Sequence, residues 1–138
     1  MNILIPMGGK GLRFQETGLS IPKPLIDVDG DTVISRVLDS LKLQGQFIYV
    51  HRQDHAETHL IDKIINKKQK GENFYLQDDN EGQVQTCLAA RELINTNEPL
   101  LIVNSDNYFV WDPASLDNLI ENKEVDGAAF TFIDPHRS

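Results

Sequence analysis

The chain has 138 residues, of which 40% are hydrophobic and 25% are charged, as is typical of a folded domain with its own core. Thirteen Lys and Arg oppose twenty-one Asp and Glu, and a net charge of −8 argues against binding to nucleic acid or to an anionic membrane surface. No apolar run reaches the roughly 20 residues of a membrane helix, we expect no signal peptide, and the single cysteine, Cys87, excludes an intramolecular disulfide and favours the cytoplasm.

Strands and helices are predicted to alternate in the first half of the chain. They are expected over residues 2–6 (strand), 33–41 (helix), 46–50 (strand) and 54–65 (helix). Either Asp31 or Thr32 can cap the first helix, and Asp54 with Glu57 resembles a capping box for the second. One apolar face of that second helix is predicted, made of Leu60, Ile61, Ile64 and Ile65. The lysines at 67, 68 and 70 favour a helix end over a phosphate or RNA contact.

The same alternation continues in the second half. Elements are expected over residues 74–76 (strand), 82–95 (helix), 100–103 (strand), a short helix begun by Asp112 and Pro113, and 127–133 (strand). The helix at 82–95 is predicted to pack Val84, Cys87 and Leu88 inward. The apolar run at 100–103 predicts a strand buried on both faces. Alternating strands and helices predict an α/β fold, a three-layer α/β/α Rossmann-like domain with a mostly parallel sheet.

A glycine-rich segment follows the first predicted strand, where ligands bind in open parallel sheets. It reads Pro-Met-Gly-Gly-Lys-Gly-Leu-Arg-Phe over residues 6–14. Its glycines allow backbone N–H groups to approach phosphate oxygens, and Lys10 and Arg13 add positive charge. Residues 1–25 carry a net charge of +2 against −10 for the remainder. The spacing fits neither a P-loop nor a dinucleotide fingerprint, so a phosphate site and an incidental glycine turn both stay open at this point.

Lys23 lies between two prolines, Pro22 and Pro24. Proline restricts its own backbone and that of the residue before it, so we expect Lys23 on a stiff, extended segment. A lysine held in this way could stabilise charge that develops on a phosphoryl group. The alternative is an ordinary exposed lysine in a proline-rich loop.

Taken together, these motifs resemble the signature of the sugar nucleotidyltransferases, also called NDP-sugar pyrophosphorylases. The resemblance rests on residues 7–14, on Pro-Lys-Pro-Leu at 22–25 and on Val-Asp-Gly at 28–30. It implies a nucleotide-diphospho-sugar transferase type of fold. Residues 1–138 would be a single nucleotide-binding domain, truncated relative to the family, whose distal lysine and second metal-binding aspartate cannot be assigned here.

The resemblance also implies roles for individual residues. Arg13 and Lys23 are expected to be catalytic, and Asp106, in Val-Asn-Ser-Asp at 103–106, is expected to bind Mg²⁺. Gln77 and Gly82 are expected to read the nucleobase, although Gln83 stands where the family usually has threonine. The remaining predicted nucleotide-binding residues are Met7, Gly8, Gly9, Lys10 and Gly11.

The implied reaction joins a nucleoside triphosphate to a sugar 1-phosphate and releases pyrophosphate. The expected partners are therefore these two small molecules, with Mg²⁺ as cofactor and with neither nucleic acid nor membrane, and a homo-oligomer is left open. Two alternatives keep the fold: a nucleotide-binding module without turnover, and nucleotidyl transfer to a non-sugar phosphate acceptor. Both alternatives could be tested by supplying different phosphate acceptors together with a nucleoside triphosphate and measuring pyrophosphate exchange or release.

A third alternative is a metal-binding protein built on the histidines at 51, 55 and 59. His51 is expected in an extended segment, away from the helical face that the other two could share. Two ligands are fewer than the three or four that zinc usually has. Surface histidines on a capped helix are the simpler interpretation.

Overall fold

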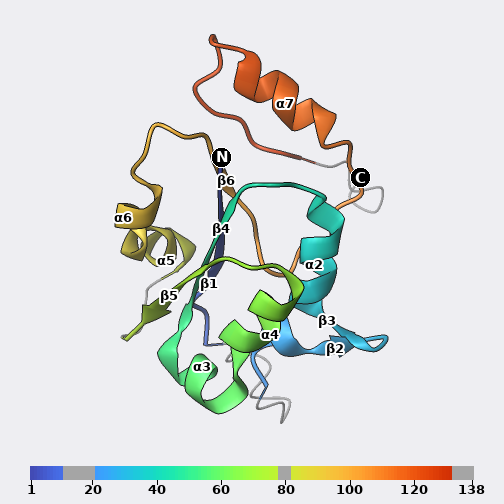
Figure 1. Ribbon diagram of the computed structural model, residues 1–138, viewed down its shortest axis with the longest axis vertical. Coiled ribbons are helices and arrows are strands. Elements are labelled where there is room, and N and C mark those ends of the chain that lie inside the picture. Colours follow the sequence, from blue (N-terminus) through green and yellow to red (C-terminus); the bar gives the residue numbers. More distant parts are fainter. Residues whose placement is uncertain (11–20, 78–81, 132–138) are drawn as a thin grey trace, which may run out of the picture.

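The computed structural model describes residues 1–10, 21–77 and 82–131, which form a parallel sheet with helices on both sides (Figure 1). The four strands are β1 (Asn2–Met7), β4 (Gln46–Arg52), β5 (Glu72–Leu76) and β6 (Leu100–Ile102). They lie in the order β5-β4-β1-β6, and every pairing is parallel. All six residues of the central strand β1 are buried, as its continuous apolar run predicts. The predicted three-layer α/β/α architecture is confirmed.

One face of the sheet is covered by α2 (Val33–Leu41) and α4 (Ile61–Lys68). Helix α2 has the predicted bounds, and the Oγ1 of its N-cap residue Thr32 accepts a hydrogen bond from the Ser35 N–H at 3.2 Å. Between this helical layer and the sheet lies the larger core cluster, which we call the wide core. Its buried residues are Ile3, Ile5, Met7, Leu25, Ile34, Val37, Leu38, Leu41, Phe47, Tyr49, Ala56, Ile61, Ile65 and Val103.

The helix predicted over 54–65 is two helices, α3 (Gln53–His59) and α4, which meet at Leu60. Leu60 has a left-handed backbone (φ 54°), so the helical phase restarts there, and only Ile61 and Ile65 face the core. The prediction of a single apolar face is therefore wrong for Leu60 and Ile64, which are exposed. The capping box is also wrong, because α3 begins at Gln53 with Arg52 at its N-cap position, so Asp54 lies inside the first turn, where its carboxylate accepts hydrogen bonds from the Arg52 guanidinium.

The opposite face of the sheet is covered by α5 (Gln83–Ala89) and α6 (Arg91–Ile94), which are separated at Ala90 (Figure 1). The buried residues here, which we call the narrow core, are Leu4, Ile48, Val50, Leu76 and Ala90. The inward face predicted for the helix at 82–95 is wrong for Val84 and Leu88, which are 72% and 58% exposed. Thr86 and Ala90 face the sheet instead, because small side chains let α5 approach β1 closely.

Strand β6 is the outermost strand of the described sheet, next to β1. Its side chains Leu100 and Ile102 are 40% and 49% exposed, so the predicted burial on both faces is wrong. Residues 127–131 form no strand with the described chain, and 132–133 lie outside it. Helix α7 (Ala114–Glu121) follows the predicted start closely, since the Asp112 carboxylate accepts from the Ala114 N–H at 3.1 Å.

Among residues 21–32, which the structure describes, three short elements precede α2. They are a 3-10 turn, η1 (Lys23–Leu25), and the antiparallel strands β2 (Asp27–Val28) and β3 (Asp31–Thr32). Asp29 and Gly30 join the two strands with positive φ angles of 51° and 82°, as a tight hairpin requires. No helix in the described part of the chain is long and apolar enough to cross a membrane.

Candidate functional site

Strands β1 and β6 bring the predicted phosphate loop and the predicted metal residue to one place. From β1 the chain runs to β4 on one side, whereas β6 pairs with β1 on the other side, so the sheet order reverses between β1 and β6. In open α/β sheets a crevice forms beyond the carboxyl ends of the strands at such a reversal. A pocket of about 340 Å³ lies there, within the size range of small-molecule sites.

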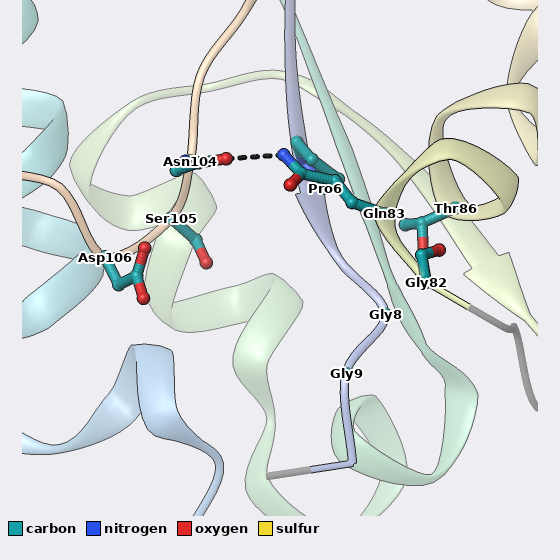
Figure 2. Close-up of a pocket in the computed structure, with 9 residues that line it drawn as sticks. All are labelled: Pro6, Gly8, Gly9, Gly82, Gln83, Thr86, Asn104, Ser105 and Asp106. Carbon is teal, nitrogen blue, oxygen red and sulfur yellow. Dashed lines mark hydrogen bonds between the residues drawn. The ribbon is translucent and has the colours of Figure 1, made fainter.

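Three segments line this pocket (Figure 2). The first comes from the end of β1, the second from the start of α5, and the third from the chain just after β6. The lining residues are Pro6, Gly8, Gly9, Gly82, Gln83, Thr86, Asn104, Ser105 and Asp106. Of the predicted site residues, the structure therefore brings together Gly8, Gly9, Gly82 and Asp106.

The two described glycines of the loop have different surroundings. A Cβ on Gly8 would lie 2.5 Å from Thr86 Oγ1 and 2.8 Å from Leu76 Cδ1, so the approach of β1 to α5 requires glycine there. A Cβ on Gly9 would have no atom within 4 Å, and Gly9 is exposed to the pocket. Gly8 is thus needed for packing, whereas Gly9 is open to a ligand. Gly11 and Arg13 lie outside the described residues.

The pocket is bridged by a side-chain hydrogen bond between Gln83 and Asn104 (Figure 2). Gln83 is the first residue of α5 and follows Gly82, whose φ of 96° favours glycine. Its Nε2 donates to Oδ1 of Asn104, so one neutral amide pair links the helix to the end of β6. A neutral, hydrogen-bonding wall suits an uncharged part of a ligand.

The charged end of the site joins two of the residues predicted from sequence. The Lys23 ammonium contacts the Asp106 carboxylate directly, across 83 positions of sequence. Lys23 was expected in extended backbone, but it begins the 3-10 turn η1, which the Leu25 N–H closes with a 2.8 Å hydrogen bond to the Pro22 carbonyl. Because Pro24 and Leu25 are buried, the turn anchors the lysine backbone beside the pocket.

Three other predicted site residues, Met7, Lys10 and Gln77, are not among the residues that line the pocket. The Met7 side chain is 5% exposed and belongs to the wide core. Gln77 is exposed at the end of β5, where its amide donates to Gln53, and it is not among the residues that line the pocket. Lys10 is exposed at the end of the described loop segment.

Sequence reasoning assigned no site role to five residues that line the pocket, namely Pro6, Gln83, Thr86, Asn104 and Ser105. The segment that holds Asn104 and Ser105 was noticed, because it follows a predicted strand, but only Asp106 was assigned a role. Nothing in the sequence pairs Gln83 with Asn104, since these residues meet only when β6 pairs with β1 and α5 packs on β1 from one face of the sheet.

The three histidines of the alternative metal site are not brought together. His51 lies fully buried in β4, where its Nε2 is 3.0 Å from Asn73 Oδ1. The rings of His55 and His59 face each other on α3 with centroids 6.3 Å apart, and burial lowers the pKa of His55. In the residues that the structure describes, no three His, Cys, Asp or Glu side chains are grouped so as to hold a metal ion.

The profile of the MobA-like NTP transferase domain matches residues 3–137. The chain belongs to this family. It is also 28% identical, over 111 residues, to the mannose-1-phosphate guanyltransferases beta-A and beta-B of Xenopus laevis, and the match covers 77% of this chain and 31% of each relative. The chain thus spans about a third of the length of these curated relatives.

Two solved structures illustrate the fold of this MobA-like domain. The nucleoside-diphosphate-sugar pyrophosphorylase of Vibrio cholerae RC9 superposes with a TM-score of 0.65 at 21% identity, covering 83% of this chain and 52% of that one. The UTP-bound UGPase of Acinetobacter baumannii has a TM-score of 0.54 at 16% identity, covering 75% and 45%. At these identities the likeness shows the fold.

Proposed function

We propose that this domain transfers a nucleotidyl group from a nucleoside triphosphate to a sugar 1-phosphate. The observation that carries the proposal is the pocket at the carboxyl ends of β1 and β6, with the Lys23–Asp106 pair beside the Gly8–Gly9 backbone. Membership of an NTP transferase family and the sugar-phosphate guanyltransferases among its relatives support the same reaction. We further propose that residues 1–138 act as one domain and that the reaction takes place in the cytoplasm.

The polarity of the pocket suggests how a nucleotide would bind. The triphosphate would lie along the Gly8–Gly9 backbone toward Lys23 and Asp106, and the uncharged nucleoside would lie toward Gly82 and Gln83. Arg13 and Lys10 stay candidates for phosphate contacts, as does Gln77 for the nucleobase.

In the proposed reaction an oxygen of the sugar phosphate attacks the α-phosphorus of the triphosphate. A new P–O bond to that oxygen forms, the bond between the α-phosphorus and its bridging oxygen to the β-phosphate breaks, and pyrophosphate leaves with that electron pair. The attacking phosphate is already anionic, so no general base is needed. The protein would act mainly by positioning and by neutralising charge, with Lys23 close to the reacting phosphates.

The residues around Asp106 fit a magnesium ion. Mg²⁺ prefers oxygen ligands and is commonly held by one or two carboxylates together with substrate phosphates. The pocket offers the Asp106 carboxylate, the Ser105 hydroxyl and the Asn104 amide oxygen. When bound, the ion would neutralise charge on the phosphates.

The test is pyrophosphate release from the 138-residue chain with GTP and mannose 1-phosphate as the first substrate pair, followed by other triphosphates and acceptors. We expect Lys23→Met and Asp106→Asn to lower the rate at least about 100-fold, the size of effect typical of a lost electrostatic contact in a transition state. The matched surface variants Lys63→Met and Asp117→Asn should keep the parent rate, because both residues are exposed helix positions away from the pocket.

A second candidate function is nucleotide binding without turnover. It is favoured by one observation, that the lining of the pocket, within the described part of the chain, holds a single carboxylate, Asp106. Binding of Mg²⁺ and a triphosphate with no pyrophosphate released from any sugar phosphate would select this function. If the parent chain binds no triphosphate at all, both candidates are wrong.

A further inference from the structure

Lys23 and Asp106 contact each other directly at the edge of the pocket, although each is also proposed to contact a ligand. Their side chains are 43% and 32% exposed, and an ion pair with that much solvent contributes little to the stability of a fold. The turn η1 holds the lysine backbone with its own hydrogen bonds and with buried Pro24 and Leu25. The fold therefore does not depend on this contact, and we expect the contact to affect ligand binding at the pocket instead.

The lysine ammonium and a divalent cation compete for the Asp106 carboxylate, because both are attracted to its single negative charge. A cation bound to Asp106 while Lys23 stays in contact would set a double positive charge within a few ångströms of a single one, which is unfavourable near a protein surface. Residues 104–106 supply no second carboxylate to offset that repulsion. Cation binding at Asp106 is therefore weakened while the ammonium stays in contact, and an ammonium that moves away is stabilised by another anion.

We propose that Lys23 blocks Asp106 against a divalent cation until a nucleotide binds, so that metal and triphosphate enter the site together. This inference rests on the proposed function, because the triphosphate is the anion that would draw Lys23 away from the carboxylate. The lysine side chain has four rotatable bonds on an anchored backbone, so the exchange needs no movement of the sheet or of η1. Lys23 is then a positioning residue for the metal as well as a phosphate contact.

The experiment measures binding of Mn²⁺, an oxygen-preferring ion visible by electron paramagnetic resonance, to the 138-residue chain without nucleotide. We expect Lys23→Met to bind Mn²⁺ about tenfold or more tightly than the parent, because a like charge beside the carboxylate is lost. The exposed lysine variant Lys63→Met should match the parent. The double variant Lys23→Met, Asp106→Asn should lose the gain, which locates the ion at Asp106.

A second measurement uses the reciprocity of linked binding, with Mn²⁺ titrated in the presence and absence of GTP. GTP should tighten Mn²⁺ binding to the parent by a larger factor than it does for Lys23→Met, in which the block is already gone. The inference is overturned if Lys23→Met binds Mn²⁺ no more tightly than the parent without nucleotide, or if GTP tightens both proteins equally. A parent chain that binds no triphosphate would instead overturn the proposed function, whatever the Mn²⁺ affinity of Lys23→Met.

Discussion

The two faces of the sheet are covered very differently. The wide core is sealed by α2 and α4 with large aliphatic side chains such as Ile34 and Ile65, which are fully buried. The narrow core is covered by the shorter helices α5 and α6, and α5 turns Thr86 rather than Val84 toward the sheet. The wide core thus contributes most of the stability. The narrow core buries less apolar surface, and α5 lies close enough to β1 to line the pocket.

The difference in packing between the two faces explains the position of the site. The first residue of α5 lines the pocket, and close approach of that helix to β1 places it there. A helix packed through large aliphatic residues would stand farther from the strand, because interaxial distance follows the size of the side chains at the contact.

The sharpest test of the difference replaces one leucine on each side. We expect Leu41→Ala, at a position 2% exposed in the wide core, to lower the free energy of unfolding by about 3 kcal/mol. Leu88→Ala on α5 should change it by less than about 0.5 kcal/mol, since that side chain is 58% exposed. Urea unfolding measures the loss of stability in each variant. Equal losses for the two variants would contradict the proposed difference between the two faces.

Gly8 tests how closely α5 must approach β1. We expect Gly8→Ala to lower the free energy of unfolding by about 2 kcal/mol, because the new methyl group would overlap Thr86 and Leu76. Adding Thr86→Ala should recover part of that loss. Gly9→Ala, which meets no atom within 4 Å, serves as the control and should leave unfolding unchanged while it alters triphosphate binding.

Leu60, between α3 and α4, is an unfavourable position on the wide-core side of the sheet. Its left-handed backbone is unfavourable for leucine, and its side chain is 47% exposed, so little burial is lost when it is removed. Leu60→Gly should therefore raise the free energy of unfolding by about 0.5 kcal/mol, measured as a higher urea midpoint, after the entropy of the added glycine is counted. The neighbouring change Ile61→Gly should lower it instead, because Ile61 is fully buried.

The single cysteine, Cys87, can be used to probe burial at the narrow core. Partial burial against the narrow core raises the pKa of the Cys87 thiol, so less thiolate is present near neutral pH than in the unfolded chain. Alkylation by iodoacetamide should be slower in the native protein than in urea, and its rate should rise with pH around a higher midpoint. Because the unfolded thiol ionises first, stability should also decline slightly as the pH rises through the unfolded pKa. A native midpoint equal to the unfolded one would contradict the shift.

Sequence patterns predicted the wide-core face better than the narrow-core face, for a physical reason. Helix α2 buries the aliphatic residues that repeat at helical spacing, so its bounds follow from the sequence, whereas the choice of Thr32 over Asp31 as its cap comes from the structure. Helix α5 is held by Thr86 and Ala90, whose small size matters only because Gly8 lies beneath α5. Leu60 shows the same limit, since no local pattern announces a left-handed residue between two helices.

Prediction of the candidate site was likewise partial. The glycine loop and Asp106 could be found because each follows an apolar strand, and parallel strands end at the same edge. The direct contact of Lys23 with Asp106, and that of Gln83 with Asn104, join residues far apart in sequence and could not be derived from spacing. Met7, which belongs to the same motif, places its side chain in the wide core, so a contact of Met7 with a nucleotide stays a prediction for its backbone.

Strand β6 has one consequence for handling the protein. It pairs with β1 on one side and is the last strand of the described sheet on the other, with Leu100 and Ile102 partly uncovered. An edge of this kind offers backbone hydrogen-bonding groups and apolar side chains to any strand that meets it. At the concentrations used for crystallisation, we therefore expect self-association through β6, and a lysine in place of Ile102 should improve solubility.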